Sequence, residues 1–226
     1  MLYGGFAAKG KKLSEAVEKS GDIVKKKADD VLEEAATNII RHFDDAIEDG
    51  VSNNITRAIK DGILDKDIVE ELGDEIKDIA ASKSKKLSWE EVQALFKRGN
   101  DFNRKVNNMN PPKYQFNEVT VEQMVNGQAK KFRLDGYNEG FEIVSRKATD
   151  FDNIQTSTFE KYCDELLSKY KVGTKITAPK YLELNGKTLQ GKYKLEVPKS
   201  NEISSKLDEF RKIADDKGIE IIFEVE

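Results

Sequence analysis

The sequence is poor in the side chains on which many enzymes depend, because its 226 residues include one cysteine, Cys163, and one histidine, His42. A single cysteine cannot form an internal disulfide, and its place in an amphipathic helical pattern favours a buried, inert thiol over a nucleophile. His42 lies among acidic residues, as expected of a solvated histidine. Zinc sites built on several histidines and Ser-His-Asp triads are therefore disfavoured. Any catalysis has to use carboxylates and lysines.

Long apolar runs are also missing. The mean hydropathy is −0.66, and no run approaches the roughly 18 residues of a membrane-spanning helix. Residues 1–8 are too short and too poorly flanked for a standard signal peptide, and they fit the cut end of a longer chain. A hydrophobic fraction of 38% still permits a packed core beside the 35% of charged residues. The length fits a small helical part followed by a compact α/β domain.

Charge is unevenly distributed along the chain. Residues 1–96 hold 15 Lys and Arg against 21 Asp and Glu, a net charge of −6, and residues 97–226 hold 23 against 21, a net charge of +2. These values account for the overall charge of −4. The asymmetry predicts two modules with different roles. We interpret the acidic part as solvated helices, and a balance of +2 is too small to indicate nucleic-acid binding without local basic clusters.

The N-terminal third has the apolar spacing of helices, which we expect between about residues 11 and 82. The polar residues 83–86 (Lys-Ser-Lys-Lys) read as a hinge between two parts of the chain. We therefore predict an α-helical N-terminal region at 1–84 and a second domain at 85–226.

The second domain begins with a helix and continues with a pattern of strands. Ser88 and Glu91 have the spacing of a capping box, which predicts a helix that ends near Gly99. Alternating segments bounded by turn residues then predict a mixed β-sheet flanked by helices, of α+β or α/β class. The strands are expected at residues 118–124, 130–135, 140–146, 181–184, 192–197 and 219–225, and the helices at 154–170 and 202–217.

The densest group of potential catalytic residues lies between Asp135 and Lys147. Asp135 ends one predicted strand and Glu142 lies on the next, so we expect the two carboxylates to hold a shared Mg²⁺ or Mn²⁺ ion across the sheet. Lys147 follows, where an ammonium group positions water or stabilises negative charge. These groups suit the hydrolysis of a phosphodiester. Structural ion pairs produce the same spacing, so spacing alone leaves both interpretations open.

The following helix adds Gln155 and Tyr162, which lie seven residues apart and therefore on one helical face. Such a pair can bind substrate phosphate or order water, although surface and core roles give the same pattern. Taken with Asp135, Glu142 and Lys147, these residues resemble the PD-(D/E)xK nuclease superfamily, which has the restriction-endonuclease fold.

The residues from Glu142 to Lys147 (Glu-Ile-Val-Ser-Arg-Lys) resemble a narrower group, the restriction-endonuclease-like toxin domains at the C-terminus of bacterial polymorphic toxins. The segments 154–155, 159–162, 88–92 and 97–103 share the likeness, which covers about residues 85–226. The helices before residue 85 would then form the pre-toxin segment.

The resemblance implies a metal-dependent nuclease, with DNA favoured as the substrate, on a restriction-endonuclease-like mixed sheet. It also implies an exported bacterial effector that acts in the cytoplasm of a target cell and is neutralised by a cognate immunity protein. Asp135, Glu142 and Lys147 would be catalytic, the two acids holding Mg²⁺ or Mn²⁺, and Glu90 or Glu91 of the first helix could join the metal ligands. The implied supporting residues are Ser145, Arg146, Gln155 and Tyr162.

The position of the lysine departs from the superfamily pattern. In that pattern the lysine lies two residues after the acid, where both side chains point to one face of a strand. Here Val144 has that position, and Lys147 lies five residues after Glu142. Either the strand bends before Lys147, or the functional lysine lies elsewhere, with Lys130 and Lys131 as the nearest alternatives.

Two other functions stay open from the sequence. A ribonuclease on the same fold, including one that cleaves tRNA, would use aromatic residues to stack on unpaired bases. Phe132, Tyr137 and Phe141 are placed for that role, and they fit core packing equally well. A non-enzymatic interaction module would instead bind a partner through the acidic helices.

Overall fold

The computed structural model describes residues 25–226, which form two compact units. The first unit holds residues up to 77 together with 85–89, and the second holds 78–84 together with 90–226. Helix α3 (Lys66–Lys83) runs through this division, so its C-terminal end belongs to the second unit. The chain crosses this division after residues 77, 84 and 89, and the predicted boundary after residue 84 stays a prediction.

The first unit is helical. Residues 25–40 form a helix, which is followed by η1 (Asp44–Ala46), α2 (Val51–Lys60) and most of α3. The part of the predicted helical region before residue 25 lies outside the described residues. Phe43 is fully buried, and a Cβ atom on Gly73 of α3 would lie 2.8 Å from its Cδ1 atom. The glycine therefore lets α3 approach the Phe43 ring.

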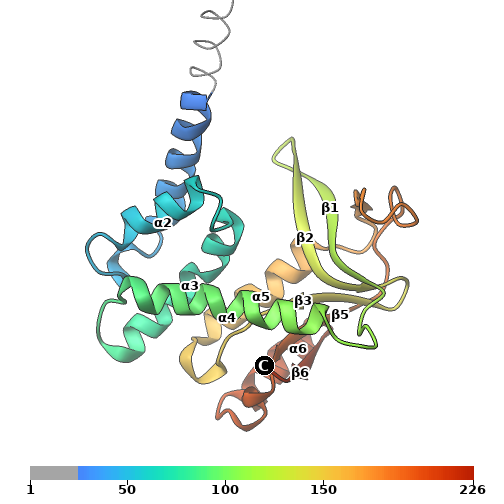
Figure 1. The fold of residues 1–226 in the computed structure, drawn as a ribbon. Coiled ribbons are helices and arrows are strands. Elements are labelled where there is room, and N and C mark those ends of the chain that lie inside the picture. The colour runs from blue at the N-terminus through green and yellow to red at the C-terminus, as the bar shows by residue number, and fades with distance from the viewer. Residues whose placement is uncertain (1–24) are drawn as a thin grey trace, which may run out of the picture. The chain divides into compact units, whose positions relative to one another are not determined.

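The second unit is built on a six-stranded sheet with the order β4-β1-β2-β3-β5-β6 (Figure 1). The first four strands in this order pair antiparallel, and β3, β5 and β6 pair parallel. This combination gives a mixed sheet of α+β class, as predicted. The strands are β1 (Phe116–Val125), β2 (Gln128–Asn138), β3 (Glu142–Arg146), β4 (Lys175–Ile176), β5 (Lys192–Pro198) and β6 (Ile219–Glu224).

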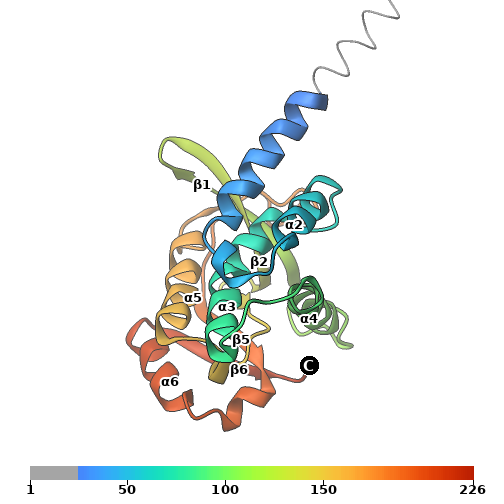
Figure 2. The same ribbon diagram turned by 90° about the vertical axis from the view of Figure 1, so that its left-hand side faces the viewer.

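Helices cover both faces of this sheet (Figure 2). Helices α5 (Thr156–Lys169) and α6 (Leu207–Asp216) pack on one face, the α5 side, through a large core in which the Phe159 and Phe210 rings stack with centroids 4.2 Å apart. Helix α4 (Trp89–Asn107) packs on the other face, the α4 side. The buried residues of that smaller core are Phe102, Val106, Tyr114 and Val144.

The first predicted hairpin is confirmed. Strands expected at 118–124 and 130–135 are β1 and β2, and both are longer than expected. Asn126 and Gly127 between them have φ values of +51° and +79°. Two consecutive positive φ angles are what a two-residue hairpin turn of type I′ requires, and the Asn-Gly pair accommodates them with little strain.

Two later predictions are wrong. Residues 181–184 do not form a strand but a turn that follows Pro179, in which the Leu184 N–H donates to the Tyr181 carbonyl. Leu184 is fully buried although it lies in a turn. A buried apolar residue in a loop gives the same sequence pattern as a residue of a buried strand. The two-residue strand β4 pairs with β1 instead. The helix expected at 202–217 is divided into η3 (Lys199–Ile203) and α6 by an extended Ser204.

Helix α4 also continues beyond the end predicted at Gly99, as far as Asn107. Phe102 and Val106 prolong its buried face against Val144. A glycine inside a helix costs about 1 kcal/mol relative to alanine, and the burial of two such apolar side chains exceeds that cost. A short 3-10 helix, η2 (Phe151–Asn153), connects β3 to α5.

Candidate functional site

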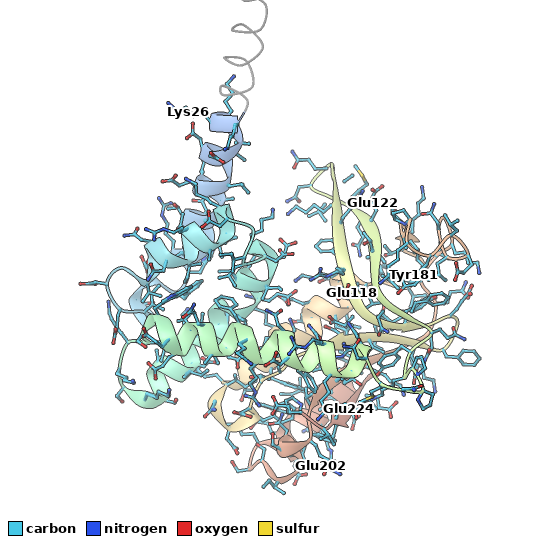
Figure 3. The ribbon with its side chains drawn as sticks, viewed as in Figure 1. Lys26, Glu118, Glu122, Tyr181, Glu202 and Glu224 are labelled. Atoms are coloured by element: carbon cyan, nitrogen blue, oxygen red, sulfur yellow. The ribbon has the colours of Figure 1, made fainter. Side chains whose placement is uncertain are left out.

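The pairing of β2 with β3 begins directly after Asp135, so the sheet divides at this residue. Residues 136–138 of β2 pair with β3, whereas β1 pairs with β2 over residues 128–137 except Asp135. The β1–β2 hairpin therefore extends beyond the end of β3 as an arm, which the short β4 joins at residues 121 and 122. Figure 3 labels Glu118 and Glu122 on this arm. Asp135 Oδ2 accepts a hydrogen bond of 2.8 Å from the Arg146 N–H. The carboxylate thus binds the last residue of β3 where the strand ladder ends.

Strand β2 is distorted around Asp135. Leu134 lies in the core on the α5 side, whereas Gly136 lies against the Tyr114 ring on the α4 side, where an added Cβ would come within 2.7 Å of Tyr114 Cδ2. Residues two apart share a face in a regular strand. Glu118, across the ladder from Asp135, has a φ of +57°. The distortion and the glycine together set where the Asp135 carboxylate points.

Strand β3 alternates regularly between the two sides. Val144 packs in the core on the α4 side. Its period of two places Glu142 and Arg146 on that same side. Ser145 and Lys147 then lie on the α5 side. Glu142 and Lys147, which the sequence analysis assigned to one catalytic group, therefore leave the sheet on opposite faces.

Lys147 belongs to a cluster on the α5 side. Its Nζ atom lies 5.0 Å from the centroid of the Tyr162 ring and 3.6 Å from Glu165 Oε2. Lys169 Nζ lies 3.5 Å from the same oxygen. Tyr162, Glu165 and Lys169 are spaced by three and four residues on α5 and so share a helical face. We call Lys147, Tyr162, Glu165 and Lys169 the lysine cluster.

Glu165 and Lys169 are the members of this cluster that the sequence did not predict, and Glu165 is the acidic one. Its side chain is 19% exposed, and Oε2 is buried without accepting a hydrogen bond. A buried carboxylate oxygen that faces two ammonium groups without a hydrogen bond has capacity left for a further cation or donor. The spacing in the sequence does place Glu165 one helical turn after Tyr162, on the same face of the helix. The side of the sheet that this face contacts, however, is set by packing.

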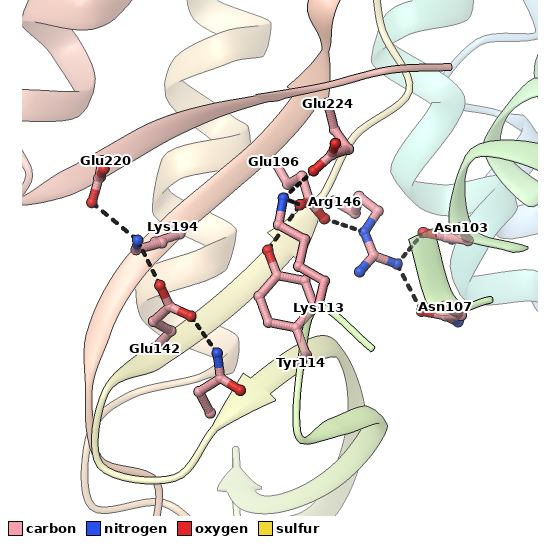
Figure 4. Close-up of polar contacts among 11 residues, drawn as sticks. Asn103, Asn107, Lys113, Tyr114, Glu142, Arg146, Lys194, Glu196, Glu220 and Glu224 are labelled. Carbon is pink, nitrogen blue, oxygen red and sulfur yellow. Dashed lines mark hydrogen bonds and ion pairs between the residues drawn. The ribbon is translucent and has the colours of Figure 1, made fainter. Parts of the chain in front are cut away.

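Glu142 is held in a separate set of ion pairs on the α4 side (Figure 4). Its Oε1 lies 2.6 Å from Lys194 Nζ, and its Oε2 accepts a hydrogen bond from Asn138 Nδ2. Lys194 also pairs with Glu220 on β6. Partial burial alone would raise the pKa of Glu142, but the hydrogen bonds from Lys194 and Asn138 outweigh burial and lower it. Glu142 is thus a cross-strand ion-pair residue.

Arg146 is enclosed on the α4 side. Its side chain and that of Glu196 on β5 have no solvent exposure, and Nε donates to Glu196 Oε2 at 2.5 Å. Nη1 donates to Asn103 and Asn107 of α4 (Figure 4). Burial, together with the Glu196 charge, raises the pKa of Tyr114, whose hydroxyl donates to Glu196. The predicted substrate contact by Arg146 is therefore not available in this structure.

The other predicted supporting residues differ in their surroundings. Ser145 is 7% exposed and Tyr162 is 3% exposed. Tyr162 lies in the core beside Lys147, so it contributes a ring face to the site. Gln155 is an exposed residue at the N-cap of α5, where its backbone N–H donates to Asp78 Oδ2 at 2.7 Å.

The secondary candidates lie on other elements. Glu91, in the first turn of α4, pairs with Lys83 at 2.8 Å, and Glu90 is exposed. Lys130 and Lys131 are exposed on the β1–β2 arm. Lys131 is opposite Glu122 in the hairpin, four residues and so about 13 Å along the strand from Asp135.

Cys163 and His42 behave as the sequence predicts for inert residues. Cys163 is fully buried in the core beside Leu166. Burial raises the pKa of its thiol to about 12, so no thiolate forms near neutral pH. His42 is exposed in a turn.

The described acidic residues do not form a complete metal site by themselves. Within residues 25–226, no three His, Cys, Asp or Glu side chains come together as a metal-binding group. Mg²⁺ commonly takes only one or two carboxylates and completes its octahedron with water and substrate phosphate. Asp135 and Glu165, with its unsatisfied Oε2, are suited to that incomplete set.

No helix among the described residues has the length and apolar character to cross a membrane. Comparisons with protein-family models, curated proteins and solved structures gave no significant match to this chain.

Proposed function

We propose that the second unit is a metal-dependent nuclease with a restriction-endonuclease-like fold. The observation that carries the proposal is the place of Asp135 at the division of the sheet. It binds the N–H of the residue directly before Lys147, and Lys147 in turn faces Glu165. Asp135 thus binds the backbone at the end of β3, and the partly buried Lys147 that follows pairs with Glu165. The order of elements supports the same fold: helix α4, three antiparallel strands, helix α5 and the parallel strand β5, with the two-residue β4 between α5 and β5.

Asp135 and Glu165 would hold Mg²⁺ or Mn²⁺ in this proposal. The ion would supply charge neutralisation at the phosphate and lower the pKa of a bound water. Glu165 takes the role that spacing assigned to Glu142, because Glu142 is on the opposite side of the sheet and its oxygens are bound by Lys194 and Asn138.

Lys147 would stabilise negative charge on the phosphate or orient the attacking water. Its side chain is 10% exposed and lies over the Tyr162 ring. Restricted solvent access and a fixed ring face keep the ammonium in one place, which makes an electrostatic contact to a developing charge more effective. Lys169, which shares the Glu165 oxygen, provides a second positive charge for the substrate backbone.

The biological role follows from the resemblance of residues 85–226 to toxin domains. In this proposal the chain is an exported bacterial effector that cleaves DNA in the cytoplasm of a target cell, and a cognate immunity protein protects the producing cell. Exposed Lys130, Lys131 and Arg133 on the β1–β2 arm supply the local basic cluster that the overall charge lacks.

The test is cleavage of plasmid DNA and of RNA by the purified chain, with Mg²⁺, with Mn²⁺ and with a chelator. We expect metal-dependent cleavage that falls about a hundredfold or more in Asp135→Asn, Lys147→Ala and Glu165→Gln. Glu142→Gln decides between the two acids and is expected to keep most activity. Absence of cleavage of either nucleic acid with both metals contradicts the proposal, as does full activity of Asp135→Asn. Cleavage of RNA alone would assign a ribonuclease.

A further inference from the structure

Arg146 connects the two sides of the sheet at the candidate site. Its backbone N–H binds Asp135, and Lys147 is the next residue. Its side chain leaves on the opposite face, where it is fully buried against Glu196. Whatever fixes the Arg146 side chain therefore also fixes the backbone from which the Asp135 contact and Lys147 arise.

Glu196 holds this segment through two different groups. Arg146 and Glu196 are register partners in the parallel β3–β5 ladder. The Glu196 carboxylate accepts from Arg146 Nε at 2.5 Å, and the Glu196 backbone carbonyl accepts from the Lys147 N–H at 2.9 Å. One residue of β5 thus binds both neighbours at the end of β3.

The surrounding groups restrain the pair further. Glu196 Oε1 accepts from Lys113 Nζ at 2.5 Å and from the Tyr114 hydroxyl at 2.8 Å. Asn103 and Asn107 of α4 each accept from the Arg146 guanidinium, at 3.3 Å and 3.0 Å. The planar guanidinium can reach Glu196 and α4 together, which a lysine ammonium does not reproduce.

The stability of the fold is a weak explanation for burying Arg146 and Glu196 together. A buried ion pair loses its hydration on both partners, and apolar residues of similar size are often as stable. Arg146 Nη2 is buried without a hydrogen-bond partner, so the desolvation is not fully compensated. A fixed geometry at the end of β3 is a benefit that apolar residues would not provide.

We propose that Arg146 and Glu196 are a positioning pair that sets the geometry between Asp135 and Lys147 from the opposite side of the sheet. The pair touches neither metal nor substrate. The inference rests on the proposed nuclease function for its effect on rate, but its effect on the Asp135 contact can be measured without any activity.

The experiment compares the full chain with the double variant Arg146→Met/Glu196→Gln. This variant removes both charges together and retains an acceptor for Lys113 and Tyr114, so no buried charge is left unpaired. Lys194→Gln is the matched control, because it removes an ion pair on the same face of the sheet without contacting Arg146. Circular dichroism and thermal unfolding verify that each variant is folded.

Two measurements are made. Amide hydrogen exchange followed by NMR reports the backbone N–H of residue 146, which binds Asp135. We expect its exchange to be about tenfold faster or more in the double variant, after correction for the intrinsic rate of the new side chain, but not in Lys194→Gln. Cleavage kinetics are expected to show kcat reduced by about a hundredfold with KM for nucleic acid nearly unchanged, as for misplaced catalytic groups.

The outcomes separate this inference from the proposed function. If the wild-type chain cleaves no nucleic acid, the proposed function fails, and the exchange result alone decides whether the pair positions Asp135. If the wild type is active and the folded double variant keeps its kcat, the positioning role is wrong. Unchanged exchange at Arg146 also contradicts it.

Discussion

At the scale of single residues, the charged side chains on the α4 side differ chiefly in how much water surrounds them. Glu142 and Lys194 have side chains that are 25% and 18% exposed, whereas Arg146 and Glu196 have no exposure. A partly exposed ion pair contributes at most about 1 kcal/mol. A buried charge depends on every partner, because none can be replaced by water.

The Glu142–Lys194 pair gives a pH-dependent prediction. Because its folded pKa is lowered, Glu142 stabilises the fold fully above pH 4.5, its ordinary value, and loses the contribution as pH falls through the lower folded pKa. Glu142→Gln should therefore reduce the free energy of unfolding by about 0.5 kcal/mol at pH 7. Urea unfolding should show the difference shrinking at pH 3, with the exposed Glu183→Gln as the control. An equal loss at both values would contradict the assignment.

Glu196, whose side chain has no solvent exposure, gives a prediction about stability. Glu196→Ala leaves the Arg146 guanidinium buried without its carboxylate, so we expect a loss of about 3–5 kcal/mol in the free energy of unfolding. Chemical denaturation measures the loss. The double variant Arg146→Met/Glu196→Gln should recover much of it, because no unpaired charge remains. A loss below about 1 kcal/mol for Glu196→Ala would mean that water enters around Arg146.

Part of the candidate site could be predicted from residue types alone. Asp135 and Lys147 were identified because few other groups in a chain with one histidine and one cysteine can serve a metal and a phosphate. The odd spacing between Glu142 and Lys147 left two interpretations open, a bend in the strand or a functional lysine elsewhere. Glu165 could not be assigned, because its meeting with Lys147 depends on how α5 packs on the sheet.

At the scale of elements, α5 is the helix that carries Tyr162 and Glu165, and its N-terminus is held by α3. Asp78 Oδ2 accepts from the Gln155 N–H at 2.7 Å and from Thr158 Oγ1 at 2.6 Å. An acidic group at a helix N-terminus satisfies free N–H groups and interacts favourably with the helix dipole. Asp78 thus acts as an N-cap supplied by another helix.

This cap can be tested by substitution. Asp78 is 7% exposed, and Asp78→Ala leaves two donors near α5 without an acceptor, so we expect a loss of about 1–3 kcal/mol in unfolding free energy. Asp78→Asn keeps an acceptor oxygen and should cost less. Chemical denaturation at pH 7 measures both, with the exposed Lys77→Ala as the control. Equal stability of Asp78→Ala and wild type would show that the cap contributes nothing.

Elements defined by local chemistry were predictable, and those defined by packing were not. The turn at Asn126 and Gly127 follows from backbone preference, which the sequence carries directly. Leu184 is buried in a turn, and its apolar neighbours gave a false strand. The two residues of β4 are too few to show a period. Gly99 suggested an end to α4 that packing of Phe102 overrides.

At the scale of the whole molecule, the net charge is negative, but positive charge is concentrated on one part of the surface. The net charge is −4, yet the exposed β1–β2 arm carries Lys130, Lys131 and Arg133 in four residues of one strand. Glu122 lies opposite Lys131 and offsets part of this charge. Under the proposed function, a chain with an acidic overall charge has to bind the phosphate backbone through such local groups.

The arm therefore predicts the salt dependence of binding. Each lysine or arginine that contacts a DNA phosphate adds about −0.9 to the slope of log K against log salt. Replacing Lys130, Lys131 and Arg133 with glutamine should weaken binding equally across sequences and make the slope shallower by about 2 to 3. Fluorescence anisotropy with the Asp135→Asn chain, which is not expected to cleave, measures the slope for labelled duplexes.

Lys85→Gln/Lys86→Gln is the control, since these exposed lysines belong to the first unit. If the triple variant keeps the wild-type slope, DNA binds elsewhere. The lysine cluster around Glu165, with Lys147 and Lys169, would then be the place to test next, by the same measurement on Lys169→Gln.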